Sequence, residues 1–104
     1  MRIYISGKIS GLPEEQAEKR FRLAEEKLKE NFIHSTIINP YVEAPKLLKN
    51  KPNATWLEYM SACIALLSRC DTIYHLYGWQ MSDGAVIEHR VAEHENFIMM
   101  YDYK

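Results

Sequence analysis

The sequence predicts an α/β protein in which a parallel sheet of about four strands is covered by helices on both faces. Short β-prone runs alternate along the chain with segments of helical periodicity, which is the pattern of strands joined by helical crossovers. The chain has 104 residues, enough to bury one hydrophobic core but too few for two. We therefore expect a single domain over residues 1–104.

Composition narrows the class of partner. Hydrophobic residues make up 47% of the chain and charged residues 26%, which is ordinary for a globular protein, and the formal net charge is −1. Without a basic field to hold a phosphate backbone, we expect no nucleic-acid polymer as a partner. No apolar run is long enough to cross a membrane, and the N-terminus enters a strand-like pattern without the features of a signal peptide, so we expect a cytoplasmic protein.

The first half of the chain reads as strand, helix, strand. Residues 2–6 form a β-prone run that stops at Gly7, and a loop with Gly and Pro follows over 8–13. From Glu14 the pattern is helical, with an apolar stripe made by Ala17, Phe21, Ala24 and Leu28. A second β-branched run at 36–38 is closed by Asn39 and Pro40.

A long loop is predicted over residues 41–54, with room for a helical turn and able to move over a site, because this segment holds Pro45, Pro52 and several lysines. Thr55 then caps a helix whose apolar arc is wider than one face. Such a helix is our candidate for a subunit interface in a homo-oligomer, a dimer or larger.

The last third predicts a strand over 71–77 ending at Gly78, a helix that begins after Ser82, and a final strand over 97–101. The full order is then βαβαβαβ, which gives a parallel sheet with right-handed crossovers. We expect a flavodoxin-like, three-layer α/β/α arrangement with strand order 2-1-3-4.

A ligand site is expected beyond the carboxyl ends of the strands, where the strand order reverses between the first and third strands. All four glycines of the chain fall on this rim: Gly7, Gly11, Gly78 and Gly84. Glycine suits close approach of backbone to a ligand, although ordinary turn glycines are an equally good interpretation. The amides at the start of the helix after Ser82 would favour an anion such as phosphate, and Ser82 would serve either as a cap alone or as a ligand as well.

Glu88 is the least expected residue of that helix. On a helical wheel it lies near the centre of a face formed by Gly84, Ala85, Ile87, Val91 and Ala92. A carboxylate buried there without a partner would cost several kcal/mol, on the order of the usual penalty for an uncompensated charge. It must therefore form a salt bridge, with Arg2 or Arg90 as candidates, or belong to a functional site one helical turn from the rim.

Several other chemistries are not predicted. The four histidines have no metal-binding spacing, so we expect neither a metal nor a cofactor. Cys63 and Cys70 form no Cys-x-x-Cys pair and are interpreted as free thiols. The loop from Lys8 to Gly11 matches neither a Walker loop nor a dinucleotide fingerprint.

Five segments, in this order and spacing, resemble the nucleoside 2-deoxyribosyltransferase superfamily, including its deoxynucleoside 5′-monophosphate N-glycosidases and a small bacterial and phage branch. They are residues 3–11 (IYISGKISG), 38–40 (INP), 56–60 (WLEYM), 70–71 (CD) and 82–88 (SDGAVIE), so the resemblance covers nearly the whole chain.

The resemblance implies a flavodoxin-like fold and an enzyme, a hydrolase or a transferase, that acts on the N-glycosidic bond of a 2′-deoxynucleoside or its 5′-monophosphate. Glu88 matches the family nucleophile, and Tyr4 matches the tyrosine that orients it by a hydrogen bond. Ser82 and the loop of residues 7–11 look closer to the monophosphate hydrolases, with Lys8 as an added cation. The substrate-binding residues expected on these grounds are Gly7, Lys8, Ile9, Ser10, Gly11, Cys63, Trp79, Ser82 and Gly84.

Two alternatives to an enzyme stay open. Cys63 stands where the family has an aspartate that contacts or protonates the base, so a catalytically inert nucleotide-binding or sensor module is one alternative. A plain interaction protein that uses the apolar helix after Thr55 is the other.

Overall fold

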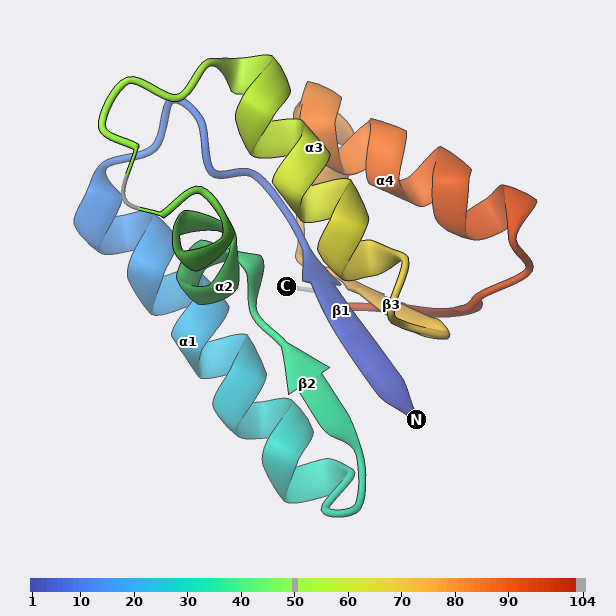
Figure 1. Cartoon of the computed structure of the whole chain (residues 1–104). Helices are drawn as coiled ribbons and strands as arrows, with labels where there is room; N and C mark the ends of the chain where they lie inside the picture. Colours follow the sequence, from blue (N-terminus) through green and yellow to red (C-terminus); the bar gives the residue numbers. More distant parts are fainter. Residues whose placement is uncertain (50, 103–104) are drawn as a thin grey trace.

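The computed structural model describes residues 1–49 and 51–102 (Figure 1). Its elements in chain order are β1 (Arg2–Ser6), α1 (Glu14–Asn31), β2 (Thr36–Ile38), α2 (Pro40–Leu47), α3 (Trp56–Leu67), β3 (Thr72–His75), the short 3-10 helix η1 (Trp79–Met81), α4 (Asp83–His94) and β4 (Ile98–Tyr101).

The strands form one parallel sheet in the order β2-β1-β3-β4. Tyr4 of β1 lies opposite Ile38 of β2 on one side and Ile73 of β3 on the other, so β1 and β3 are the inner strands. The predicted α/β fold and strand order are confirmed. The carboxyl ends of the inner strands lie side by side, and the chain leaves them toward α1 and toward α4.

Alternate residues of each strand point to opposite faces of the sheet, so each face has its own hydrophobic core. One helix covers the first face and three cover the second. Ile3 and Ile5 of β1 pack with Phe21, Ala24 and Leu28 of α1. On the opposite face the core is formed by Tyr4 and Ile73 with residues of the other three helices, which are Ala44, Ala62, Cys63, Leu66, Leu67 and Ala92. The result is a three-layer sandwich with α1 on one face and α2, α3 and α4 on the other (Figure 1).

The prediction of a long loop over 41–54 is wrong for its first part, where the chain forms the helix α2. Asn39 and Pro40, which we interpreted as the end of a strand, also start this helix. The Asn39 side chain accepts a hydrogen bond from the Tyr41 amide at 3.0 Å, and Pro40 has the φ angle required at the first helical position. Pro45 is tolerated inside this short helix while Ala44 is fully buried. Of the predicted loop, Asn50 lies outside the described residues.

The two predicted N-caps are both formed. Thr55 and Glu58 make a capping box at the start of α3, in which each side chain accepts a hydrogen bond from the other residue's backbone amide. Ser82 Oγ accepts from the Ala85 amide at 3.2 Å and so caps α4. On α4, Ala85, Glu88 and Ala92 are buried as the wheel predicts, whereas Ile87 is 40% exposed at the margin of that face.

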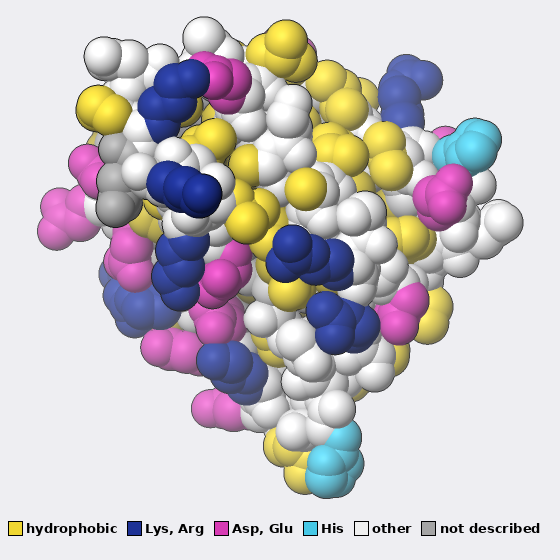
Figure 2. Space-filling model, viewed as in Figure 1, with side chains coloured by type: hydrophobic (Ala, Val, Ile, Leu, Met, Phe, Trp, Pro, Cys, Tyr) yellow, Lys and Arg dark blue, Asp and Glu magenta, His cyan; other side chains and the backbone are white. Residues whose placement is uncertain are grey.

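Hydrophobic side chains gather on the surface over α3 and α4 (Figure 2). Trp56 and Leu57 at the start of α3 are 50% and 68% exposed. Within residues 1–49 and 51–102, no helix has the length and apolar character needed to cross a membrane.

The close approach of β1 to β3 gives the first prediction. A Cβ added at Gly7 would lie 2.6 Å from Leu76 Cδ1 and 2.9 Å from Leu76 Cβ, so Gly7→Ala forces the two strand ends apart. We expect it to lower the free energy of unfolding by about 1–3 kcal/mol, as overpacking does, measured by urea denaturation. Gln16→Ala is the control, because Gln16 is exposed on α1 and alanine is a good helix former. Equal stability of the two variants would contradict this packing.

Candidate functional site

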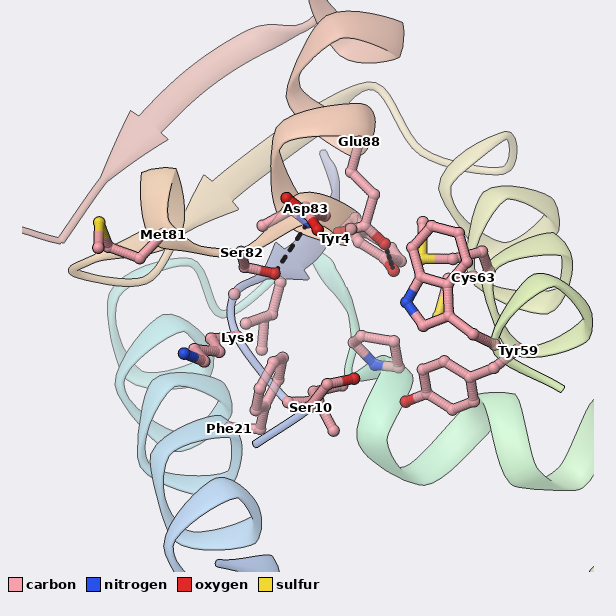
Figure 3. Close-up of a pocket in the computed structure, with 18 residues that line it drawn as sticks. Tyr4, Lys8, Ser10, Phe21, Tyr59, Cys63, Met81, Ser82, Asp83 and Glu88 are labelled. Carbon is pink, nitrogen blue, oxygen red and sulfur yellow. Dashed lines mark hydrogen bonds between the residues drawn. The ribbon is translucent and has the colours of Figure 1, made fainter. Parts of the chain in front are cut away.

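A cavity of about 250 Å³ opens beyond the carboxyl ends of β1 and β3, at the place where the strand order reverses (Figure 3). Its volume is at the small end of the range of ligand pockets. Its lining residues come from β1 and the loop after it, from α1, from α2 and α3, and from the start of α4: Tyr4, Ile5, Gly7, Lys8, Ile9, Ser10, Phe21, Pro40, Trp56, Tyr59, Met60, Cys63, Met81, Ser82, Asp83, Gly84, Ala85 and Glu88.

The carboxylate of Glu88 lies in this cavity and is held by two hydroxyl groups from β1. Tyr4 Oη donates to Glu88 Oε2 at 2.5 Å, and Ser6 Oγ donates to Glu88 Oε1 at 2.7 Å. Tyr4 and Ser6 are two residues apart on a strand, so both point to the face that α4 covers. Each carboxylate oxygen therefore has one buried hydroxyl partner, and the Glu88 side chain is fixed in position.

Glu88 is only 5% exposed, and among the described residues no ion pair includes it. The salt bridge to Arg2 that we considered is not formed, because the Arg2 guanidinium donates to the Arg69 carbonyl instead. Arg90 is exposed and also makes no such pair. Burial raises the pKa of the Glu88 carboxyl to about 7, while the hydrogen bonds from Tyr4 and Ser6 act to lower it. Near neutral pH this carboxyl is therefore divided between its acid and its anion.

The wall that α3 contributes contains a thiol and a phenol, both neutral. Burial and the nearby Glu88 charge raise the pKa of the Cys63 thiol to about 12. Burial also raises the pKa of the Tyr59 phenol well above its ordinary value. Burial and the Glu88 charge do the same for the pKa of Tyr4. All three groups keep their protons over the physiological pH range.

The opposite wall carries a cation at Lys8, a hydroxyl at Ser82 and a carboxylate at Asp83. Lys8, from the loop after β1, and Ser82, at the start of α4, lie on the side of the cavity away from Cys63 and Tyr59 (Figure 3). Because the Ser82 oxygen accepts from the Ala85 amide, its hydroxyl proton remains available to a ligand. The first turn of α4 adds the positive end of a helix dipole.

Two of the predicted substrate-binding residues lie outside this cavity. Gly11 shapes the loop after β1, with a φ of +83°, but does not line the cavity. Trp79 is the first residue of η1 and does not line the cavity. Its ring stacks on His89 with a centroid distance of 4.4 Å, and it lines a separate hollow with Tyr77 and Tyr101. Gly78, at a φ of +82°, turns the chain toward β4 and so carries Trp79 away from Glu88.

The other predicted residues line the cavity, although Gly84 has a second role. A Cβ at Gly84 would lie 2.9 Å from Met60 Sδ, so this glycine lets α4 approach α3. Met60 therefore fills part of the space next to Gly84.

Sequence analysis missed Ser6 as a partner of Glu88 and Phe21, Tyr59 and Met60 as cavity walls. Strand alternation offered a signal for Ser6, since it places this residue on the same face as Tyr4. Tyr59 and Met60 fall in the segment 56–60 that carries part of the family resemblance, but that segment gave no role for either side chain.

A protein-family model matches residues 1–101. The chain belongs to DUF4406, a domain of unknown function. A comparison with curated proteins finds no similar sequence. The chemistry available to this DUF4406 chain must therefore be argued from its own cavity. Within residues 1–49 and 51–102, no three His, Cys, Asp or Glu side chains come together in a way that would hold a metal ion.

The burial of Glu88 predicts a specific dependence of stability on pH. The carboxyl has a pKa of about 7 in the folded chain against an ordinary 4.5, so the folded state favours the protonated form, and its stability falls as pH rises through this window. Glu88→Gln removes the ionisation. We subtract the free energy of unfolding of wild type from that of the variant, both measured by urea denaturation. This difference should be roughly 3 kcal/mol larger at pH 8 than at pH 4, because only wild type loses stability as pH rises.

Glu93→Gln is the matched control, because Glu93 is exposed on the same helix. If the two variants respond to pH in the same way, the Glu88 carboxyl does not ionise in a buried environment.

Proposed function

We propose that the chain cleaves the N-glycosidic bond of a 2′-deoxynucleoside 5′-monophosphate, with Glu88 as the nucleophile and water or a second base completing the reaction. The observation that carries the proposal is a carboxylate that faces a small cavity, is oriented by two hydroxyls and has no cation partner within residues 1–49 and 51–102. A carboxylate that only stabilised the fold would have a cation or an exposed position. The sequence resemblance to the nucleoside 2-deoxyribosyltransferases agrees with this assignment.

The two sides of the cavity suit the two ends of such a substrate. Lys8, Ser82 and the first turn of α4 offer a cation, a hydroxyl and backbone amides to a phosphate. Trp56, Tyr59 and Met60 of α3 offer aromatic and apolar surface to a base. The sugar would then lie between them, beside Glu88.

In the first step a Glu88 carboxylate oxygen forms a bond to the anomeric carbon while the bond from that carbon to the base nitrogen breaks. The electron pair of that bond leaves with the base, which takes up a proton from solvent. The transition state has oxocarbenium character, and a sugar without a 2-hydroxyl stabilises it better. Water then attacks the anomeric carbon, the bond to Glu88 breaks, and the carboxylate is restored as the water proton passes to solvent. Tyr4 and Ser6 act as positioning residues that also lower the energy of the ionised carboxylate.

The direct test is release of free base, followed by chromatography, from the four deoxynucleoside monophosphates and from the matching nucleosides. We expect slow but measurable release from at least one monophosphate. We expect Glu88→Gln to lower kcat/KM by about 10⁴-fold or more, because it removes the nucleophile and keeps the side-chain volume.

Equal base release by wild type and Glu88→Gln would contradict the proposal. A rise in melting temperature with nucleotides, but no release under any condition, would instead support an inert nucleotide-binding module, the alternative that Cys63 favours.

The pH dependence tests the same site separately. Since the nucleophile must be ionised, kcat/KM should rise with pH around a midpoint near 7, the pKa of the Glu88 carboxyl. Tyr4→Phe removes a hydrogen bond to the ionised form, so its midpoint should move up by about 1–2 pH units. Tyr77→Phe is the control, because Tyr77 is exposed and lies outside the cavity, and its midpoint should match wild type. A profile that falls with pH through 7 would contradict a carboxylate nucleophile.

A further inference from the structure

The side of the cavity that faces a base lacks an effective proton donor. Among the described residues that line the cavity, the carboxyl groups are those of Glu88 and Asp83. Glu88 cannot attack the sugar as an anion and protonate the base in the same step. Asp83 is exposed, begins α4 and lies next to Ser82, on the side of the phosphate-binding groups (Figure 3).

What remains on the α3 side is the Cys63 thiol, the Tyr59 phenol, the Trp56 indole and the Met60 thioether. Cys63 is 2% exposed and lies beside Tyr4 and Glu88. Its pKa of about 12, and the raised pKa of Tyr59, make both groups poor acids at neutral pH. A neutral purine or pyrimidine leaves as an anion unless it is protonated, so this wall gives its departure little help.

The same wall suits a positively charged ring. Trp56 and Tyr59 are three residues apart on α3 and therefore lie on the same side of the helix. Electron-rich aromatic faces attract cations, and the ionised Glu88 nearby adds a full negative charge.

We infer that the base subsite takes a cationic N-glycoside, a nucleotide whose base already carries a positive charge on its aromatic ring, as N7-alkylated purines and pyridinium nucleotides do. This inference rests on the proposed function and names its substrate class. The inference is based on the position of the Glu88 carboxylate beside the aromatic side chains of Trp56 and Tyr59. Among the described residues, no carboxylic acid lies on that side of the cavity.

The reaction then needs no proton donor. A Glu88 oxygen bonds to the anomeric carbon, and the electron pair of the breaking C–N bond neutralises the positive charge of the ring, so the base departs as a neutral molecule. Water attacks the anomeric carbon, the Glu88 carboxylate leaves, and one proton passes to solvent. Charge balances, because one cation is consumed and one proton is released.

The test compares 2′-deoxyguanosine 5′-monophosphate with its 7-methyl derivative, which has the same sugar and phosphate and differs by a methyl group and a positive charge. Spontaneous loss of 7-methylguanine is measured without protein and subtracted from the rates of wild type and of Glu88→Gln. We expect wild type to prefer the methylated substrate in kcat/KM by about 10²- to 10⁴-fold, the usual contribution of a general acid that this site lacks. The 2′-deoxy form of nicotinamide mononucleotide, which keeps the same sugar and phosphate, is a second arm and distinguishes a pyridinium from an alkylated purine as the source of the charge.

Two sets of variants examine the wall itself. Cys63→Asp introduces a carboxyl on the base side that can protonate only the unmethylated leaving group, so it should reduce the preference for the methylated nucleotide. Its repulsion of Glu88 acts on both nucleotides alike and leaves that ratio unchanged. Trp56→Leu should raise KM for the methylated substrate, and Trp56→Phe should restore most of the loss because it keeps an aromatic face.

The outcomes separate the two proposals. If both nucleotides are cleaved at similar rates and both activities depend on Glu88, the proposed function holds and the cationic subsite is overturned. If wild type and Glu88→Gln release base equally from all three nucleotides, both are overturned. A preference for the methylated nucleotide, or cleavage of the 2′-deoxy form of nicotinamide mononucleotide, supports the inference when it is lost in Glu88→Gln, whether or not Cys63→Asp folds.

Discussion

The structure depends on how a single carboxylate is buried between a strand and a helix. Glu88 is enclosed by β1, α3 and α4, and its partners are two hydroxyls rather than a cation. Hydroxyl donors compensate only part of the cost of removing an anion from water, which is why the pKa of this carboxyl stays near 7. A guanidinium or ammonium at the same place would hold the group fully ionised and would also occupy the space of a ligand.

This arrangement places strict requirements on the elements around it. Tyr4 and Ser6 must both face α4, which fixes the register of β1 between β2 and β3. A slip by one residue would turn Ile3 and Ile5 toward Glu88 and leave the carboxylate without donors. The small residues Gly7 and Gly84 keep β1 close to β3 and α4 close to α3, so that the hydroxyls and the carboxylate meet at hydrogen-bonding distance.

The sequence was most informative where local patterns decide structure. Alternating strand and helix signals, together with the caps at Thr55 and Ser82, were sufficient for the fold and its strand order. Glu88 was identified because a carboxylate on a packing face has few physical explanations. The wrong predictions, the loop over residues 41–54 and Trp79 as a substrate-binding residue, both depend on a local sequence pattern that fits two structures. Asn39 and Pro40 end a strand and also begin α2, and Trp79 follows a glycine whose left-handed conformation directs the chain away from the cavity. Only the packing of the whole chain distinguishes such alternatives.

The neutral side chain at position 63 has a consequence for Glu88 that is independent of any substrate. A second carboxylate next to Tyr4 and Glu88 would repel the first, and like charges in a buried site raise the pKa of one of them strongly. Glu88, already brought to about 7 by burial, would then remain protonated at neutral pH and would be a poor nucleophile. A thiol with a pKa of about 12 avoids this repulsion. The thiol at position 63 therefore favours ionisation of Glu88, the proposed nucleophile, at the expense of a proton donor. In the proposed reaction, a leaving group that needs no proton fits this balance.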